Sequence, residues 1–401
     1  MFNPDPNHLQ AAQDLKNPFL SRVGVLLRRD RERYQPGQDV TVGQEMVDGQ
    51  SFVRVWFRTR GCSCDRQGLC TMCNYGASDT IPDGIVDRVR EVLSGDTVPS
   101  GATVLLSPSG SMFDTREVPT AVRQALFALV AETRAASIIC ETRPETVTFA
   151  AMQEYQSLVG DKQAVVEMGL ESADPWILRW CVNKRLSVDQ FFEAAGVCHD
   201  AGVTVAANVS LGTAFLDPAA AIDDAVKAAQ KAIDSGIDAC VLFPLHVRRW
   251  TVLEWLWRHG LYTPPSLWSL VEAILRINQG RQGQVSTAWY RDYNEGNPAA
   301  VAAMPVLASP ASCPRCQLRL LAALDTYRDQ GDTDALEAAA AVPCTCHDSI
   351  PTKSVGADPE FVAKCYVQMG QDVLGVPWWD SHGASVLSEL REDWARRQTG
   401  A

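Results

Sequence analysis

Short apolar runs alternate with longer amphipathic stretches through the middle of the chain. Runs of β-branched and apolar residues, short enough for strands, occur at 52–57, 103–106, 137–140, 164–168, 203–209 and 239–242. Between them, apolar residues recur at helical spacing at 85–93, 121–135, 188–201 and 219–235. Six strands that alternate with helices predict a parallel sheet with right-handed crossovers.

The pattern changes on either side of this region. Before residue 51, five arginines surround a short apolar run, which predicts a helix with a solvated basic face or, alternatively, a phosphate-binding arm: Arg22, Arg28, Arg29, Arg31 and Arg33. After residue 280, loop-like stretches precede helices predicted at 318–328, around 338–341, at 359–374 and from about 385. We therefore expect an N-terminal extension (1–50), a core (51–280) and a C-terminal domain (281–401).

The composition limits the possible classes of protein. Hydrophobic residues make up 46% of the 401 residues, which predicts a globular core. The net charge of −12 lowers the expectation of nucleic-acid binding, because phosphates require clustered Lys and Arg. No apolar run approaches the roughly 20 residues of a membrane span. The start of the chain lacks the pattern of a signal peptide, and thirteen cysteines fit a reducing compartment, so we expect a cytoplasmic protein.

Four of these cysteines lie close together in the segment 60–76. Cys62, Cys70 and Cys73 give the spacing C-x7-C-x2-C, and Cys64 is left over. In a long chain without a secretory signal, such a loop indicates a metal or cluster site and not a disulfide frame. Three thiolates on a four-iron cluster would leave one iron open to another molecule. A zinc site on all four cysteines is the alternative.

The chain resembles the radical S-adenosylmethionine (SAM) enzymes, and within them the branch that contains the archaeosine-forming enzyme and the radical SAM domain of elongator-type tRNA acetyltransferase. The resemblance covers roughly residues 51 to 280. The motifs that carry it are RTRGC (58–62), CTMCNY (70–75), SGSMFD (109–114), ETRPE (141–145), GLES (169–172), NK (183–184) and YTPPSLWSLVE (262–272).

The resemblance implies a partial (β/α)6 TIM-type barrel, an α/β fold with chemistry at the C-terminal ends of its strands. It also implies that Cys62, Cys70 and Cys73 hold a [4Fe-4S] cluster whose open iron binds SAM. Cys62 is preferred to Cys64 because the pair Gly61-Cys62 matches the family. The remaining SAM-binding residues that we expect are Tyr75, Ser109, Gly110, Ser111, Glu141, Arg143, Glu171 and Lys184.

Each of these SAM-binding residues has a structural alternative. Tyr75 would pack near the adenine or simply in the core. Ser109-Gly110-Ser111 would offer polar groups to the methionyl amine, since glycine permits close backbone approach, or form an ordinary turn. Glu141 would bind the ribose and Arg143 the carboxylate, or the two would form a buried ion pair.

The resemblance further implies reductive cleavage of SAM to a 5′-deoxyadenosyl radical, with an electron donor such as flavodoxin or ferredoxin. No catalytic residue can be named from the sequence. The segment 243–251 departs from the family's pattern, which suggests a changed substrate. Within that segment, His246, Arg248 and Arg249 would bind an anionic group or form a solvated basic turn.

A second cysteine set lies in the C-terminal region. Cys313 and Cys316 form C-x2-C, and after 27 residues Cys344 and Cys346 form C-x-C, followed by His347. Two paired sites from distant segments predict a zinc ribbon, and a second Fe–S cluster is the alternative, since thiolates bind both.

Three classes of function follow. The favoured one is a radical SAM enzyme that acts on a small molecule or a nucleoside-like compound. The second is a tRNA-modifying enzyme of the archaeosine-forming type, which cleaves a C–N bond. The third is a non-catalytic, cysteine-rich metal-binding protein.

Overall fold

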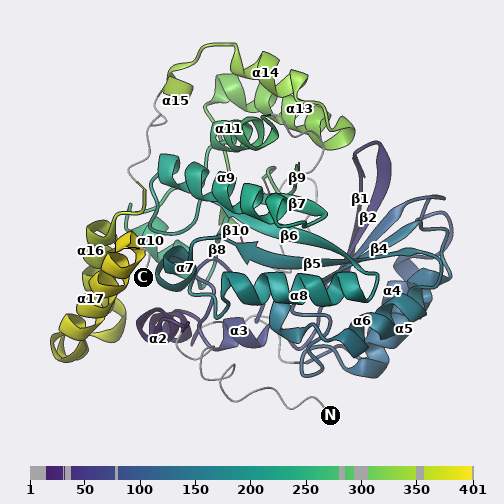
Figure 1. Cartoon of the computed structure of the whole chain (residues 1–401), viewed down its shortest axis with the longest axis horizontal. Coiled ribbons are helices and arrows are strands. Elements are labelled where there is room, and N and C mark those ends of the chain that lie inside the picture. The colour runs from purple at the N-terminus through teal and green to yellow at the C-terminus, as the bar shows by residue number, and fades with distance from the viewer. Residues whose placement is uncertain are drawn as a thin grey trace.

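The computed structural model describes residues 15–29, 31, 38–76, 80–279, 285–292, 306–348 and 356–399. A curled eight-stranded sheet forms its centre, in the order β1-β2-β3-β4-β5-β6-β7-β9 (Figure 1). The first strand, β1, is antiparallel to β2, and every later neighbour is parallel. The strands of this sheet are β1 (Val40–Val47), β2 (Gln50–Phe57), β3 (Thr103–Pro108), β4 (Ser137–Thr142), β5 (Gln163–Glu171), β6 (Thr204–Leu211), β7 (Ala239–Pro244) and β9 (Val285–Thr287).

Helices that follow the strands cover the outer face of the sheet (Figure 1). The β3 strand is buried along its whole length, as a strand between two other strands and under helices must be. The covering helices are α4 (Ile85–Val92), α5 (Thr120–Ala131), α6 (Phe149–Val159), α8 (Val188–Asp200), α9 (Pro218–Asp234) and α11 (Leu267–Asn278). The prediction of an α/β partial barrel is confirmed.

The sheet has two strands that the apolar pattern does not reveal. β1 is half-exposed, so its side chains carry no apolar signal, and it joins β2 through a tight turn with positive φ at Asp48 (47°) and Gly49 (74°). β9 has only three residues. Because β1 and β9 belong to the sheet, the sheet extends past the predicted boundaries at residues 51 and 280.

The C-terminal residues form two separate groups of helices. α13 (Pro314–Gln330), α14 (Asp334–Ala340) and α15 (Thr345–Asp348) lie with α11 above the sheet and extend its core. α16 (Pro359–Met369), the π-helical η4 (Gly370–Leu374) and α17 (Val376–Thr399) pack at the other side with the N-terminal helix α2 (Pro18–Leu27). The last helix begins at Val376, earlier than the predicted 385, because Trp379 is buried in this second core.

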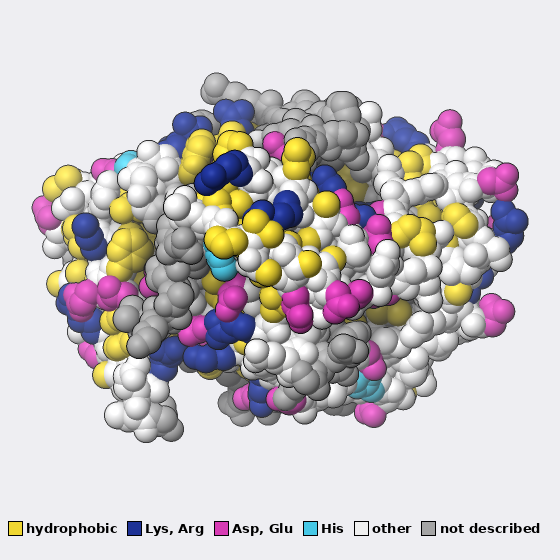
Figure 2. All heavy atoms as spheres, turned by 90° about the horizontal axis from the view of Figure 1, so that it is seen from above, with side chains coloured by type: hydrophobic (Ala, Val, Ile, Leu, Met, Phe, Trp, Pro, Cys, Tyr) yellow, Lys and Arg dark blue, Asp and Glu magenta, His cyan; other side chains and the backbone are white. Residues whose placement is uncertain are grey.

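On the face seen in Figure 2, basic and acidic side chains are interspersed among apolar ones. None of the described helices is long and apolar enough to cross a membrane.

Candidate active site

The first cysteine set lies at the C-terminal end of the parallel strands. β2 ends at Phe57, and the segment that follows carries Cys62, Cys64, Cys70 and Cys73, which line one cavity of about 180 Å³. All four cysteines are free. Thiols that line one cavity and belong to one short loop are a donor set that fits the cluster predicted from the sequence.

Side chains at the end of the N-terminal helix α2 hold the cysteine loop through hydrogen bonds and ion pairs. Arg28, just after α2, donates from Nη2 to the carbonyl oxygens of Leu69, Cys70 and Cys73 at 3.0, 3.0 and 2.9 Å. Its Nε forms an ion pair with Asp65 at 2.5 Å.

Arg31 pairs with the other oxygen of Asp65 at 2.5 Å, and both arginines are buried. The expected solvated basic face is therefore wrong for Arg28 and Arg31. They were missed because Asp65 and the loop carbonyls that hold them lie more than 30 residues along the chain.

Two glycines allow this close packing. A side chain at Gly68 would collide with the backbone of Ser21, and one at Gly24 would collide with the carbonyl of Gly68. The helix α2 and the cysteine loop therefore touch backbone to backbone. Asn183 adds a further link, since its Nδ2 donates to the carbonyl of Gly68 at 3.3 Å and its Oδ1 accepts from the backbone N–H of Asn17 at 3.0 Å.

Cys62 is the cysteine that contacts a cationic side chain. Arg143 donates from Nη1 to Cys62 Sγ at 3.4 Å. A hydrogen bond from Cys64 and the charge of Arg143 lower the pKa of Cys62, against the effect of burial. Cys64 lies 3.8 Å from Glu145 Oε1, and its hydrogen bond with Cys62 and burial raise its pKa. Of the two, Cys62 has the surroundings that favour a thiolate, which is the form that binds iron.

The guanidinium of Arg143 is fully engaged by carboxylates of the protein. It pairs with Glu117 at 2.8 Å, Asp114 at 2.7 Å and Glu145 at 2.8 Å. The alternative to SAM binding was a buried ion pair between Arg143 and Glu141. Arg143 instead pairs with Glu117, Asp114 and Glu145. Glu117, which sequence reasoning missed, is fully buried and also accepts from the backbone N–H groups of Ser63 and Ser111. The sequence signal that could have identified Glu117 was its position at the C-terminal side of β3, three residues after Asp114 of the SGSMFD motif.

The segment after β3 presents its glycine to the cavity. The hydroxyl of Ser109 accepts from the backbone N–H of Thr59 at 2.9 Å, and Ser111 Oγ lies 2.6 Å from the hydroxyl of Thr142. Both serines are buried, whereas Gly110 lines the cavity. Only the Gly110 part of the expected SAM segment is therefore placed to meet a ligand.

Glu171 and Lys184 lie together in the lining of the same cavity. Lys184 Nζ pairs with Glu171 Oε1 at 3.0 Å, and Ser210 Oγ donates to Glu171 Oε2 at 2.6 Å. Burial lowers the pKa of Lys184, but the charges of Glu171, Cys70 and Glu145 together with the hydrogen bond to Glu171 raise it by more, so the net shift is upward. Glu171 has a positive φ of 66°, a conformation that costs energy in a non-glycine residue and is typical of functional sites.

Tyr75 and Glu141 also line the cavity. Tyr75 packs against Trp56, and the guanidinium of Arg248 lies 5.3 Å from its ring centre. Glu141 accepts a hydrogen bond from Ser107 Oγ at 2.5 Å. Burial and the charge of Glu167 raise its pKa to about 7.

The three basic residues after β7 do not converge on one site. His246 is buried, with Nε2 2.5 Å from the carbonyl of Trp289 and Nδ1 3.1 Å from Ser309 Oγ. Burial lowers its pKa to about 4, so it is neutral at pH 7. Arg249 faces the ring of Trp250. Both expectations, an anion site and a solvated basic turn, are therefore wrong for His246, because tertiary packing places its ring inside the protein.

The second cysteine set has a different geometry. The sulfurs of Cys313, Cys316, Cys344 and Cys346 all lie within 4.8 Å of one another. Three of the pairs are separated by 3.6, 3.6 and 3.5 Å. Cys313 caps the start of α13, and Cys344 and Cys346 lie at α15.

Neighbouring donors surround this second set. Trp268 Nε1 of α11 donates to Cys346 Sγ at 3.2 Å, and Arg319 Nη2 donates to Cys316 Sγ at 3.5 Å. The ring of His347 stacks on Trp268, with 4.3 Å between the ring centres.

Comparison with known proteins places the chain in a family. Archaeosine synthase subunit beta of Methanosarcina acetivorans is 30% identical over 244 residues, which make up 58% of this chain and 69% of that protein. The subunit beta of Thermococcus kodakarensis is 31% identical over 224 residues, 54% of this chain and 69% of that protein. No protein-family model matches the chain.

Solved structures share the general fold at lower similarity. Methylornithine synthase aligns with a TM-score of 0.44 and 14% identity over 75% of this chain and 80% of that one. Coproporphyrinogen III oxidase from Escherichia coli, a radical SAM enzyme, aligns with a TM-score of 0.34 and 14% identity over 52% of this chain and 48% of that one. From the two relatives in sequence, the chain belongs to the archaeosine synthase subunit beta family.

Proposed function

We propose that the chain uses a [4Fe-4S] cluster on Cys62, Cys70 and Cys73 to cleave SAM and to abstract hydrogen from a small-molecule or nucleoside-like substrate. The observation that carries this proposal is the single cavity at the strand ends, which brings these three cysteines together with Gly110, Glu171 and Lys184. When bound, the cluster and SAM supply one-electron cleavage of the sulfonium and a 5′-deoxyadenosyl radical.

The protein's own residues position these groups. Arg28 fixes three carbonyl groups of the cysteine loop, and Arg143 donates to Cys62. The backbone of Gly110 offers a polar edge to a ligand amine, and the Lys184 ammonium, held by Glu171, offers a positive charge to a ligand carboxylate. Tyr75 and Glu141 line the same cavity, where an adenine and a ribose would find a ring face and a hydrogen-bond acceptor.

The proposed roles depart from the sequence-based expectation at three residues. Ser109 and Ser111 would hold the segment after β3 in place and would not contact SAM, because their hydroxyls form hydrogen bonds within the protein. Arg143 would act on Cys62 and its loop, because three carboxylates already hold its guanidinium. We therefore propose Arg143 as a positioning residue and not as a ligand of the SAM carboxylate.

A second candidate function is modification of tRNA. The relatives' name, archaeosine synthase subunit beta, supports it, and the word subunit supports a partner chain. The net charge of −12 supports the small-molecule substrate instead. In both cases a one-electron donor such as flavodoxin or ferredoxin and a reducing compartment such as the cytoplasm are part of the proposal.

The test is anaerobic incubation of the reconstituted chain with SAM and dithionite. Formation of 5′-deoxyadenosine is the expected result, and its absence would overturn the proposed chemistry. Mass spectrometry of a metabolite pool and of a tRNA pool, each with and without SAM, then separates the two candidates. A SAM-dependent mass change confined to tRNA would reject the small-molecule substrate.

We further propose that Cys313, Cys316, Cys344 and Cys346 hold one zinc ion. A tetrahedral ion with Zn–S bonds of about 2.3 Å places its sulfurs about 3.8 Å apart. The observed separations of 3.5 and 3.6 Å match that value. Because four thiolates close the site, the ion would be structural and would join α13 and α15.

Metal analysis of anaerobically prepared protein tests this assignment. We expect about four irons and about one zinc per chain. About eight irons without zinc would show a second four-iron cluster and overturn the zinc assignment.

A further inference from the structure

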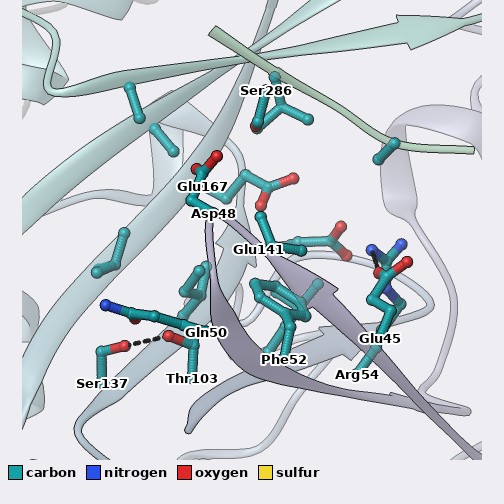
Figure 3. Close-up of a pocket in the computed structure, with 18 of the residues that line it drawn as sticks. Glu45, Asp48, Gln50, Phe52, Arg54, Thr103, Ser137, Glu141, Glu167 and Ser286 are labelled. Carbon is teal, nitrogen blue, oxygen red and sulfur yellow. Dashed lines mark hydrogen bonds and ion pairs between the residues drawn. The ribbon is translucent and has the colours of Figure 1, made fainter. Parts of the chain in front are cut away.

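A second cavity lies inside the barrel, beyond the cysteine cavity, and of the proposed SAM contacts only Glu141 also lines it. Its volume is about 510 Å³, within the range of small-molecule sites. Figure 3 shows the side chains that line it, among them Phe52 and Arg54 of β2 and the strand-start residues Thr103 and Ser137. The cavity therefore occupies the half of the barrel nearest the starts of the strands.

Two glutamates join this cavity to the cysteine cavity. Glu141 of β4 and Glu167 of β5 are Cα partners in the parallel register, so their side chains lie on the same face of the sheet. Both residues line both cavities. They therefore stand at the boundary between the place where SAM is proposed to bind and the space behind it.

No cation of the described chain neutralises this pair directly. Neither carboxylate forms an ion pair within 4.0 Å in the described residues, although the charges of Arg54 and Arg248 act on Glu141 from farther away. Ser107 donates a hydrogen bond to Glu141 at 2.5 Å. Glu167 is 5% exposed. Burial raises the pKa of Glu167, and the nearby side chain of Asn208 and the charge of Arg54 lower it.

The cavity as a whole is acidic. Its single basic side chain among the described residues is Arg54, which is already paired with Glu45 at 2.6 Å and lies 4.5 Å from the ring centre of Trp289. Five of the lining residues are acidic: Glu45, Asp48, Glu141, Glu167 and Asp238. Such a cavity disfavours a phosphate group and favours a positive one. A buried carboxylate pair is costly unless a ligand supplies the opposite charge.

We propose that Glu141 and Glu167 bind a protonated nitrogen group of the substrate, and that the rest of this substrate fills the cavity against Phe52 and Trp289. This inference rests on the proposed function, since it names the substrate class of the same enzyme. The cationic group would lie at the boundary of the two cavities, and the adjoining carbon atoms would therefore be those nearest the proposed SAM site. Charged hydrogen bonds to the two carboxylates supply the selectivity for a cation over a neutral compound.

The test is binding of an aromatic amine to the reconstituted full-length protein. Tryptamine is the probe, 3-ethylindole is its neutral analogue, and indole-3-acetate is an anionic one. By calorimetry at pH 7.5, we expect tryptamine to bind about tenfold or more tightly than 3-ethylindole, and indole-3-acetate to bind least. Equal affinity for the three compounds would overturn the proposal without the need for any variant.

Variants locate the binding group. Glu167→Gln and Glu141→Gln keep the side-chain shape and remove the charge, and each should weaken tryptamine binding about tenfold. Asp238→Asn is the matched control, because Asp238 lines the same cavity but already accepts from the backbone N–H of Val205 at 2.8 Å and lies 2.8 Å from His199 Nε2. If Asp238→Asn weakens binding as much as Glu167→Gln, the cation does not bind at the pair.

Stability against pH gives a readout that does not depend on a ligand. Burial and the charge of Glu167 raise the pKa of Glu141 to about 7, against the opposing effects of the Ser107 hydrogen bond and the charges of Arg54 and Arg248. The protonated form is therefore preferred in the fold, so its stabilising contribution is present below pH ~4.5 and is lost as the pH rises through about 7. Glu141→Gln should therefore lose less stability than the wild type between pH 5 and pH 8. An identical loss in both proteins would show that the carboxylate is not held in a buried, unneutralised state.

The outcomes separate this inference from the proposed function. Formation of 5′-deoxyadenosine without selective amine binding would reject only the substrate class. Selective amine binding in protein that cannot cleave SAM would reject the radical chemistry and leave a cation-binding cavity.

Discussion

The two cysteine sets of this chain show how similar ligands can be built into different kinds of site. The first set lines a cavity, and its loop is fixed by arginines from a helix far away in the sequence. The four sulfurs of the second set lie within 4.8 Å of one another, at the start of α13 and around the start of α15. Under the proposed assignments, the first set would leave room for a ligand beside its cluster, whereas the second would be closed by its own four thiols.

The surroundings of the two sets differ in the same way. Around the first, guanidinium groups bind backbone carbonyls and buried carboxylates, so the loop is held as a rigid support. Around the second, Trp268 and Arg319 donate directly to sulfur. The difference agrees with the proposal that the first site carries the chemistry and that the second holds the fold together.

The largest expected effect is loss of the first set's ligands. Cys70→Ala should abolish 5′-deoxyadenosine formation and remove the cluster, and Cys62→Ala and Cys73→Ala should do the same. Cys64→Ala should keep most of the activity, because its thiol lacks the cationic contact of Cys62. The measurements are product formation by chromatography and iron content. If Cys64→Ala loses iron and Cys62→Ala keeps it, the ligand assignment is wrong.

Next is the loss of a ligand of the second set. Cys316→Ser should remove zinc and lower the free energy of unfolding by about 5 kcal/mol or more, since metal binding is part of the folding energy of this region. The iron content should not change. Denaturation followed by circular dichroism, with metal analysis, checks both points. Cys198→Ala, a buried cysteine outside both sets, is the control and should leave iron and zinc unchanged.

Removing the Arg28 side chain, which holds the loop of the first cysteine set, should have a smaller effect. Arg28→Met leaves the buried carboxylate of Asp65 with one partner and three loop carbonyls without their donor. The expected cost is about 3–5 kcal/mol, with less iron and unchanged zinc. Arg29→Met, at an exposed position next to it, should change stability by less than about 0.5 kcal/mol. Equal iron content in the two variants would show that Arg28 is not needed to hold the cysteine loop in the form that binds the cluster.

The smallest effect concerns one hydrogen bond at the second set. Trp268→Phe keeps an aromatic ring against His347 and removes the N–H that donates to Cys346. We expect a loss of about 1 kcal/mol and faster transfer of zinc to a chelator, with no change in SAM cleavage. Trp394→Phe, on α17, serves as the control. Faster loss of zinc from the control as well would point to general loosening of the fold.

The sequence by itself determined the fold class and the order of the main elements. The six central strands were visible because buried strands need continuous apolar runs. The half-exposed β1 and the three-residue β9 were not visible, because neither carries such a run. The cysteine spacings were likewise local, so both sets could be named from the sequence.

Only the tertiary structure decided how distant side chains pair. Arg28 was predicted to lie on the surface, because its neighbours in the sequence do not show that it pairs with Asp65 and donates to three backbone carbonyl groups of the cysteine loop. Arg143 carried a prediction of ligand binding, and its guanidinium pairs with Glu145 nearby and with Asp114 and Glu117 from the segment after β3. The pairing of Glu141 with Glu167 depended on strand register. Ion pairs and cavities arise from residues that the chain brings together only on folding, and a periodic pattern contains no information about them.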